Sequence, residues 1–113
     1  MRNPEITRKL IINESLALFN TKGYQATSLS DITEATGVTK GAIYANFSNK
    51  EEVAAAAFNH AVEIILGRVR ECIREASTAP LKLKAVLQYY EKYVLNPPIP
   101  GGCPVLNLAV EAD

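Results

Sequence analysis

The feature that most restricts the fold is a pair of helix-capping signals placed only a few residues apart. Residues 28–31, SLSD, have the S-x-x-D form of a capping box, and Gly37 follows where a helix of about two turns would end. Thr39 can then cap another helix at once. Because isolated helices shorter than ~12–15 residues are marginal in water, two such short helices must be held by packing against neighbouring helices.

Apolar residues recur at helical spacing along the chain, and strand-like alternation is missing from the sequence. The first run predicts a helix over residues 5–22, with Gly23 as a left-handed C-cap. The apolar face of this helix consists of Ile11, Ile12, Ser15, Leu16 and Phe19. The sequence therefore predicts an all-α fold.

The third predicted helix, Lys40–Phe47, has only Ile43 and Phe47 as a buried row. A second capping box at residues 48–51, SNKE, opens a long helix that continues to about Ala76. At 1.5 Å per residue this helix would extend on the order of 40 Å. We therefore expect it to leave one domain and to enter another.

The second half of the sequence predicts two more helices. After a linker ending at Pro80, an apolar row marks a fifth helix: Leu83, Val86, Leu87, Tyr90 and Val94. The prolines and glycines of residues 96–102 break it, and Cys103-Pro104 begins a further, mostly apolar helix. The first three predicted helices, within residues 1–50, have the order of a helix-turn-helix unit, and residues 51–113 would form further helices.

Composition sets broad limits on location and partners. The chain has 12 basic and 12 acidic residues, with a net charge of +2 over residues 1–50 and −2 over residues 51–113. This distribution permits nucleic-acid binding without requiring it. Two cysteines are too few for a disulfide framework, and neither a secretory signal nor an apolar run of ~20 residues is visible, so we expect a cytoplasmic protein without a membrane segment.

The short third helix has a surface suited to a DNA groove. Apart from its buried row, its residues are small or polar: Lys40, Gly41, Ala42, Tyr44, Ala45 and Asn46. Small side chains allow the backbone to approach a surface, while lysine can reach guanine or phosphate and tyrosine or asparagine can donate to phosphate oxygens. Lys50 opens the next helix near the same surface. This pattern predicts a recognition helix for the major groove.

Residues 7–53 carry a long ordered motif: TR-x₂-II-x₆-F, KGY, TS, DI, A-x-GVTKG, IY, F and NKE. The motif resembles the N-terminal domain of the TetR/AcrR family of transcriptional regulators. The resemblance implies an all-helical homodimer that binds a palindromic double-stranded operator. It also implies repression that is released by a small-molecule effector held in the C-terminal domain. Residues 1–50 would then be a three-helix helix-turn-helix DNA-binding domain, and residues 51–113 would be the first helices of an incomplete effector-binding and dimerisation domain.

The resemblance also assigns roles by position. Phosphate contacts would come from Ser28, Thr39, Tyr44, Asn46 and Lys50. Base edges would face Lys40, Gly41, Ala42 and Ala45, with Ser30 nearby. Asn46 stands where the family often has His or Tyr, and it keeps a hydrogen-bond donor.

The implied mechanism is steric or competitive repression by a dimer. Two recognition helices would enter successive major grooves about 34–36 Å apart, and a ligand held beside the long helix would tilt it and change that separation. Residues 97–113 resemble a stretch of some members' ligand-binding domains more weakly. The family's dimerising C-terminal helices have no counterpart, so we expect either a fragment or a different mode of dimerisation.

Candidate ligand-pocket residues are Tyr90, Cys103, Asn107 and Glu111. Asn107 and Glu111 share one helix face and can equally form a surface or dimer-facing pair. Packing between helices is the simpler role for the tyrosines at positions 89, 90 and 93. Cys103 at a helix N-terminus would ionise more easily, which makes redox sensing an alternative role.

Other chemistry is not indicated. His60 has no second ligand at metal spacing, and Cys72 lies on an apolar stripe as a small hydrophobe. The sequence has no nucleophile–base pairing, no glycine-rich phosphate loop and no metal cluster, so we expect no enzyme, cofactor or metal. The rival interpretation is a helical protein-interaction or ligand-binding module that has kept the scaffold and lost DNA binding.

Overall fold

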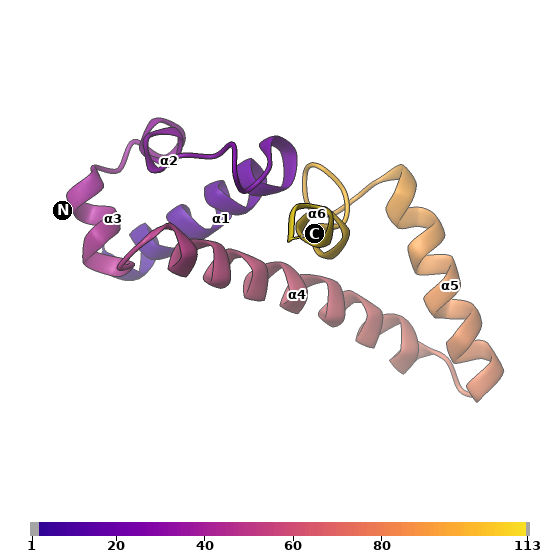
Figure 1. Ribbon diagram of the computed structural model, residues 1–113. Helices are drawn as coiled ribbons and strands as arrows, with labels where there is room; N and C mark the ends of the chain where they lie inside the picture. Colours follow the sequence, from indigo (N-terminus) through magenta and orange to yellow (C-terminus); the bar gives the residue numbers. More distant parts are fainter. Residues whose placement is uncertain (1–2, 113) are drawn as a thin grey trace.

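A computed structural model describes residues 3–112 (Figure 1). These residues form six helices with short connections between them and include no strand. The helices are α1 (Pro4–Lys22), α2 (Leu29–Thr36), α3 (Lys40–Asn46), α4 (Lys50–Glu75), α5 (Ala79–Leu95) and α6 (Pro104–Ala112). The long α4 packs against α1 at one end and α5 at the other, and α6 contacts both α1 and α4. The prediction of an all-α fold is confirmed for the described residues.

The ends of α1 follow from local chemistry. Asn3 accepts a hydrogen bond from the Glu5 amide at 2.9 Å, and Pro4 occupies the first helical position, where its missing N–H costs nothing. Gly23 is the C-cap as predicted, with φ 99° and ψ 153°. The prediction of a left-handed conformation there is wrong, because this ψ lies far from the left-handed helical region.

The two short helices are capped as the sequence predicts. In α2, the Ser28 hydroxyl accepts from the Asp31 amide at 3.0 Å and the Asp31 carboxylate accepts from the Ser28 amide at 2.9 Å. Gly37 ends this helix at φ 71° and ψ 9°, a left-handed conformation that glycine adopts without steric cost. Thr39 then caps α3 by accepting from the Ala42 amide at 3.2 Å.

The prediction that Ser48 caps the long helix is wrong by one residue. The N-cap of α4 is Asn49, whose side-chain oxygen accepts from the Glu52 amide at 2.9 Å. The Glu52 carboxylate accepts from the Ser48 amide at 2.9 Å. Asparagine caps as well as serine does, so Asn49 can take the place of Ser48, while Glu52 bonds the amide before the N-cap rather than the N-cap amide of a capping box.

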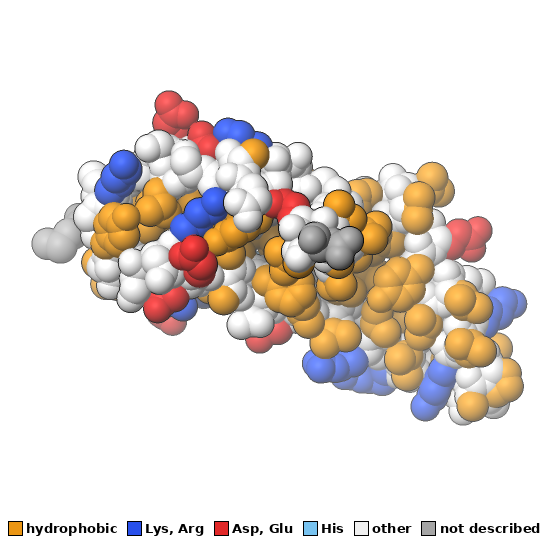
Figure 2. All heavy atoms as spheres, in the orientation of Figure 1, with side chains coloured by type: hydrophobic (Ala, Val, Ile, Leu, Met, Phe, Trp, Pro, Cys, Tyr) orange, Lys and Arg blue, Asp and Glu red, His pale blue; other side chains and the backbone are white. Residues whose placement is uncertain are grey.

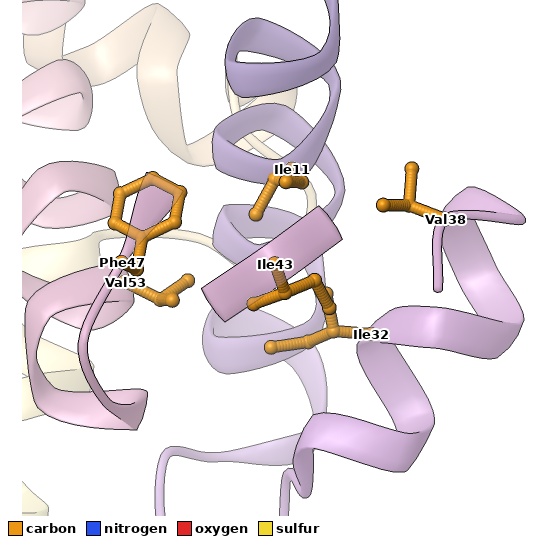
Figure 3. Packing of buried hydrophobic residues seen from close by; sticks show 6 residues of the cluster. All are labelled: Ile11, Ile32, Val38, Ile43, Phe47 and Val53. Atoms are coloured by element: carbon orange, nitrogen blue, oxygen red, sulfur yellow. The ribbon is translucent and has the colours of Figure 1, made fainter. Parts of the chain in front are cut away.

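A first apolar cluster holds the N-terminal helices together (Figure 3). Every member is 7% exposed or less: Ile11, Ile32, Val38, Ile43, Phe47 and Val53. They come from α1, α2, the turn after α2, α3, its C-cap and α4. The predicted buried row of Ile43 and Phe47 is thus confirmed, and tertiary packing explains how a seven-residue helix is stable.

A second apolar cluster joins α4 to the following helices. Its buried members are Leu16, Ala57, Ala61, Ile65, Tyr93 and Ile99. Because Val53 belongs to the first cluster and Ala57 to the second, α4 contributes to both. The long helix thus joins the two clusters, and its predicted passage from one domain into another stays a prediction.

The apolar row that marks α5 in the sequence is not the main buried side of this helix. Its expected apolar row faces outward, with Leu83 64% and Val94 81% exposed, and hydrophobic side chains cover much of this half of the surface in Figure 2. The buried side is instead marked by Tyr93, with Tyr89 half-buried beside it. The Tyr93 hydroxyl donates to the Gly102 carbonyl at 3.0 Å, a hydrogen bond that an apolar row cannot make.

Candidate nucleic-acid interface

One side of α3 is packed and the other is open. Ile43 is 1% exposed and lies in the first cluster, whereas the neighbouring Tyr44 points away from that cluster and is 53% exposed. Lys40, Gly41 and Ala45 are also exposed, and Ala42 is half-buried. The outer side of this helix therefore carries one cation, one phenol and small residues, as a surface that approaches a groove requires.

Asn46 does not extend from α3. Its side-chain nitrogen donates to the Ala42 carbonyl of the same helix at 3.0 Å, which leaves the residue half-buried. The Asn46 backbone carbonyl in turn accepts from an Arg8 guanidinium nitrogen at 3.3 Å. The side chain would have to leave Ala42 before it could donate this N–H to a phosphate.

Arg8 is a candidate that the sequence reasoning did not assign. Its guanidinium carbon lies 4.5 Å from the centroid of the Phe47 ring, and a guanidinium over a ring face is attracted by the ring's quadrupole. This places an exposed cation at the C-terminal end of α3, where the helix dipole also favours positive charge. The sequence feature that could have identified Arg8 is the Thr7-Arg8 pair of the motif.

The candidates on α2 surround its capping box. Ser28 and Ser30 are exposed, and the Ser28 hydroxyl keeps its own proton to donate because it acts only as an acceptor in the cap. Lys22 donates to the Asp31 carboxylate at 2.8 Å. This ammonium, followed by the Ser28 amide, lowers the pKa of Asp31 from 3.8 to about 2.

Lys50 is held against an aromatic ring. Its ammonium nitrogen lies 4.1 Å from the centroid of the Tyr24 ring, and the side chain is half-buried. Tyr24 also packs beside Phe19, with ring centroids 5.5 Å apart. Burial and the neighbouring Glu51 carboxylate raise the pKa of Tyr24. The ring is therefore a neutral, partly buried platform for the Lys50 ammonium.

Two of the ligand-pocket candidates, Asn107 and Glu111, form hydrogen bonds with the N-terminal part of the chain. The Glu111 carboxylate accepts from the amides of Tyr24 at 2.6 Å and Gln25 at 2.9 Å. The Asn107 side chain donates to the Asn20 side-chain oxygen at 2.7 Å. Both residues therefore join α6 to the end of α1 and to the connection that follows it.

A cleft with a cavity volume of about 180 Å³ lies between α1, α4 and α6. Its walls are mostly apolar, and Asn107 and Glu111 contribute to them. The lining also includes Leu16, Phe19, Tyr24, Ala54, Ala55, Ala57, Phe58, Pro104 and Leu108. We call this space the junction cleft.

The four ligand-pocket candidates do not meet in one site. Tyr90 is 47% exposed on the outer side of α5, with its ring centroid 5.3 Å from that of Tyr89. Cys103 is half-buried and packs against the second apolar cluster. Neither residue lines the junction cleft, which Asn107 and Glu111 do line.

Two further observations concern the described residues, 3–112. Within that range, the His, Cys, Asp and Glu side chains form no group of three or more that could hold a metal ion. None of the six helices there combines the length and apolar character needed to cross a bilayer.

Two known protein families match parts of this sequence. Residues 11–57 match the family described as bacterial regulatory proteins, tetR family. Residues 79–113 match the family described as tetracyclin repressor-like, C-terminal domain. The chain belongs to the TetR family. The predicted resemblance is confirmed, and TetR-family regulators bind DNA and are generally not enzymes.

Individual TetR-family proteins are similar over most or all of the chain. A solved TetR transcriptional regulator from Chloroflexus aurantiacus is 40% identical, with a TM-score of 0.92 over 100% of this chain and 57% of that protein. An uncharacterised HTH-type transcriptional regulator from Lactococcus lactis is 32% identical over 93% of this chain and 54% of its own length. TtgR from Pseudomonas putida is 36% identical over 80% of this chain and 44% of its own length. The chain thus spans about half the length of these curated relatives.

Proposed function

We propose that this chain is the DNA-binding part, joined to the first effector-domain helices, of a cytoplasmic transcriptional regulator that is not an enzyme. The observation that carries the proposal is the two-sided character of α3. Ile43 is buried in the first cluster, while Tyr44 and its small or cationic neighbours lie open on the other side. A helix held from behind in this way can enter a major groove without losing its own packing.

The contacts we propose come from exposed and half-buried residues of α2, α3 and the start of α4. Base edges face Lys40, Gly41, Ala42 and Ala45, with Ser30 nearby. Phosphates are contacted by Ser28, Thr39, Tyr44, Lys50 and, after leaving Ala42, Asn46. Arg8 is an additional phosphate ligand at the end of α3, because its exposed guanidinium already bonds the Asn46 carbonyl.

A groove-blocking variant tests the proposal. Ala45→Leu adds bulk to an exposed helix position, so it should leave the free energy of unfolding within about 0.5 kcal/mol. It should abolish binding to a labelled duplex that the wild type enriches from a random-sequence pool. The matched control is Ala109→Leu on the exposed side of α6, which should bind DNA as the wild type does.

Two outcomes would contradict the proposal. If Ala45→Leu bound the duplex normally, α3 would not be the recognition helix. If the wild type showed no salt-sensitive retention of any duplex, the alternative of a helical interaction module that has lost DNA binding would replace it.

We further propose that the protein acts as a homodimeric repressor of a palindromic operator and is released by a small molecule. We divide it at residue 50 into DNA-binding and effector domains. The junction cleft supports the ligand part, since its walls are mostly apolar and carry a few polar side chains, as small-molecule sites usually do. A hydrophobic fluorescent dye should bind the wild type and bind less well to Ala54→Leu, which would fill the cleft. Equal dye binding by both proteins would remove the cleft as the effector site.

A further inference from the structure

Both oxygens of the Glu111 carboxylate accept hydrogen bonds from the connection between α1 and α2. One oxygen accepts from the Tyr24 amide at 2.6 Å and the other accepts from the Gln25 amide at 2.9 Å. These two amides, Gln25 first, lower the pKa of Glu111, so the carboxylate is charged at neutral pH. Hydrogen bonds with an ionised acceptor are about twice as strong as neutral ones. This pair of hydrogen bonds therefore holds α6 in place relative to the connection between α1 and α2.

A second set of contacts fixes the other end of the same junction. Asn20 donates to the Pro100 carbonyl at 2.8 Å and accepts from Asn107 at 2.7 Å. Gly101 lies so close that a β-carbon there would come within 2.2 Å of the Asn20 carbonyl oxygen. Within the described residues, α6 and the segment before it are therefore held in one position relative to the end of α1.

Tyr24 connects this junction to Lys50. The backbone of Tyr24 is bound by Glu111, and its ring lies 4.1 Å from the Lys50 ammonium. The charge of Lys50 is also near enough to Glu111 to act on its carboxylate. Displacing α6 would free the Tyr24 backbone, and the ring that holds Lys50 would lose its fixed position.

We propose that Glu111 is a positioning residue for Lys50, and that movement of α6 away from the Tyr24–Gln25 amides withdraws Lys50 from a DNA phosphate. This inference rests on the proposed role of Lys50 as a phosphate contact. Through the Glu111 side chain, the position of α6 would determine whether Lys50 can contact a phosphate. An effector that enters the junction cleft beside Glu111 could displace α6 and so withdraw Lys50.

The test compares Glu111→Gln with Glu91→Gln, an exposed glutamate on α5, in the intact protein. Glutamine at position 111 would present its own N–H to one of the two amides, so one contact turns repulsive. We expect Glu111→Gln to weaken binding to the enriched duplex about three- to tenfold and to reduce the salt slope by about one, the effect of losing one phosphate contact. Glu91→Gln should change neither quantity.

A double-mutant cycle separates positioning from a purely structural role. If Glu111 acts through Lys50, then Glu111→Gln should have no further effect on DNA affinity in a Lys50→Ala background. Additive effects in the cycle would overturn the proposal, as would tighter DNA binding by Glu111→Gln, which would mean that its charge merely repels phosphate. Urea unfolding confirms that each variant is folded.

Hydrogen exchange gives a readout that does not depend on DNA. The amides of Tyr24 and Gln25 should exchange faster in Glu111→Gln than in Glu91→Gln. Faster exchange with unchanged DNA affinity would show the contact to be structural only and would overturn the proposal. A wild type that binds no duplex would reject the proposed function as well, whereas a binding wild type with an inert Glu111→Gln would reject this inference alone.

Discussion

The Lys50 ammonium and the Tyr24 ring form a cation–π pair, 4.1 Å apart, at the start of α4. A lysine on a helix surface normally samples many rotamers, and ordering it on DNA would cost side-chain entropy of up to about 2 kcal/mol. The Tyr24 ring restricts Lys50 before any DNA is present. The pair therefore provides a pre-organised cation beside α3.

Removing this cation should weaken DNA binding without regard to sequence. We expect Lys50→Ala to lower affinity for all duplexes and to reduce the salt slope by about one, because one phosphate contact is lost. The measurement is fluorescence anisotropy over a range of salt concentrations. Lys82→Ala, an exposed lysine on α5, is the control and should keep the wild-type slope. An unchanged slope in Lys50→Ala would exclude Lys50 from the phosphate contacts.

The ion pair and capping box of Asp31 should make stability depend on pH. Because the pKa of Asp31 is about 2 in the folded chain and 3.8 without these partners, its contribution is fully present above pH 3.8 and is lost as pH falls through 2. We expect Asp31→Asn to be less stable than the wild type at neutral pH, with the difference shrinking between pH 4 and 2. Urea unfolding followed by circular dichroism measures this difference.

The control for Asp31 is Glu34→Gln on the same helix. Glu34 is exposed and makes no ion pair among residues 3–112. A stability difference for Asp31→Asn that stayed constant from neutral pH down to pH 2 would argue against the Lys22–Asp31 contact.

The first apolar cluster should depend strongly on the single buried residue of α3. Ile43→Ala removes a side chain that is 1% exposed, and substitutions of this kind cost about 2–5 kcal/mol. Ile6→Ala is the control, since Ile6 is 60% exposed and should lose far less. Chemical denaturation measures both. A small effect of Ile43→Ala would mean that α3 is not held by this cluster.

Two glycines should respond to alanine in opposite directions. Gly101 has φ +98° and a β-carbon there would meet the Asn20 backbone at 2.2 Å, so Gly101→Ala should destabilise the chain by about 1–3 kcal/mol. Gly67 lies inside α4 with nothing within 4 Å of such a carbon. Gly67→Ala should therefore stabilise the chain by up to about 1 kcal/mol. Equal thermal shifts for the two variants would contradict the close contact at Gly101.

The N-terminal helices could be predicted because their signals are local. Ser28 and Thr39 bond amides three residues ahead, and Gly37 ends a helix by its own conformation. The displaced cap at Asn49 shows the limit of such signals, because Ser48 and Asn49 are both suitable capping residues. Only the geometry of the helix start decides between them.

The orientation of α5 and the role of Glu111 could not be predicted for a different reason. Helical periodicity on α5 is compatible with two rows, and the Tyr93 contact with Gly102 selects the less obvious one. The amides that bind Glu111 belong to Tyr24 and Gln25, which precede it in the chain by 87 and 86 positions. The sequence places Asn107 and Glu111 on one face, but it does not say which distant backbone that face will meet.

The two apolar clusters meet within a single turn of α4, between Val53 and Ala57. Because α4 is one continuous helix, no loop separates the two clusters, and unfolding that begins in one cluster should spread to the other. The N-terminal and C-terminal parts of this chain should thus unfold in one cooperative transition, and a substitution that destabilises one part should also destabilise the other.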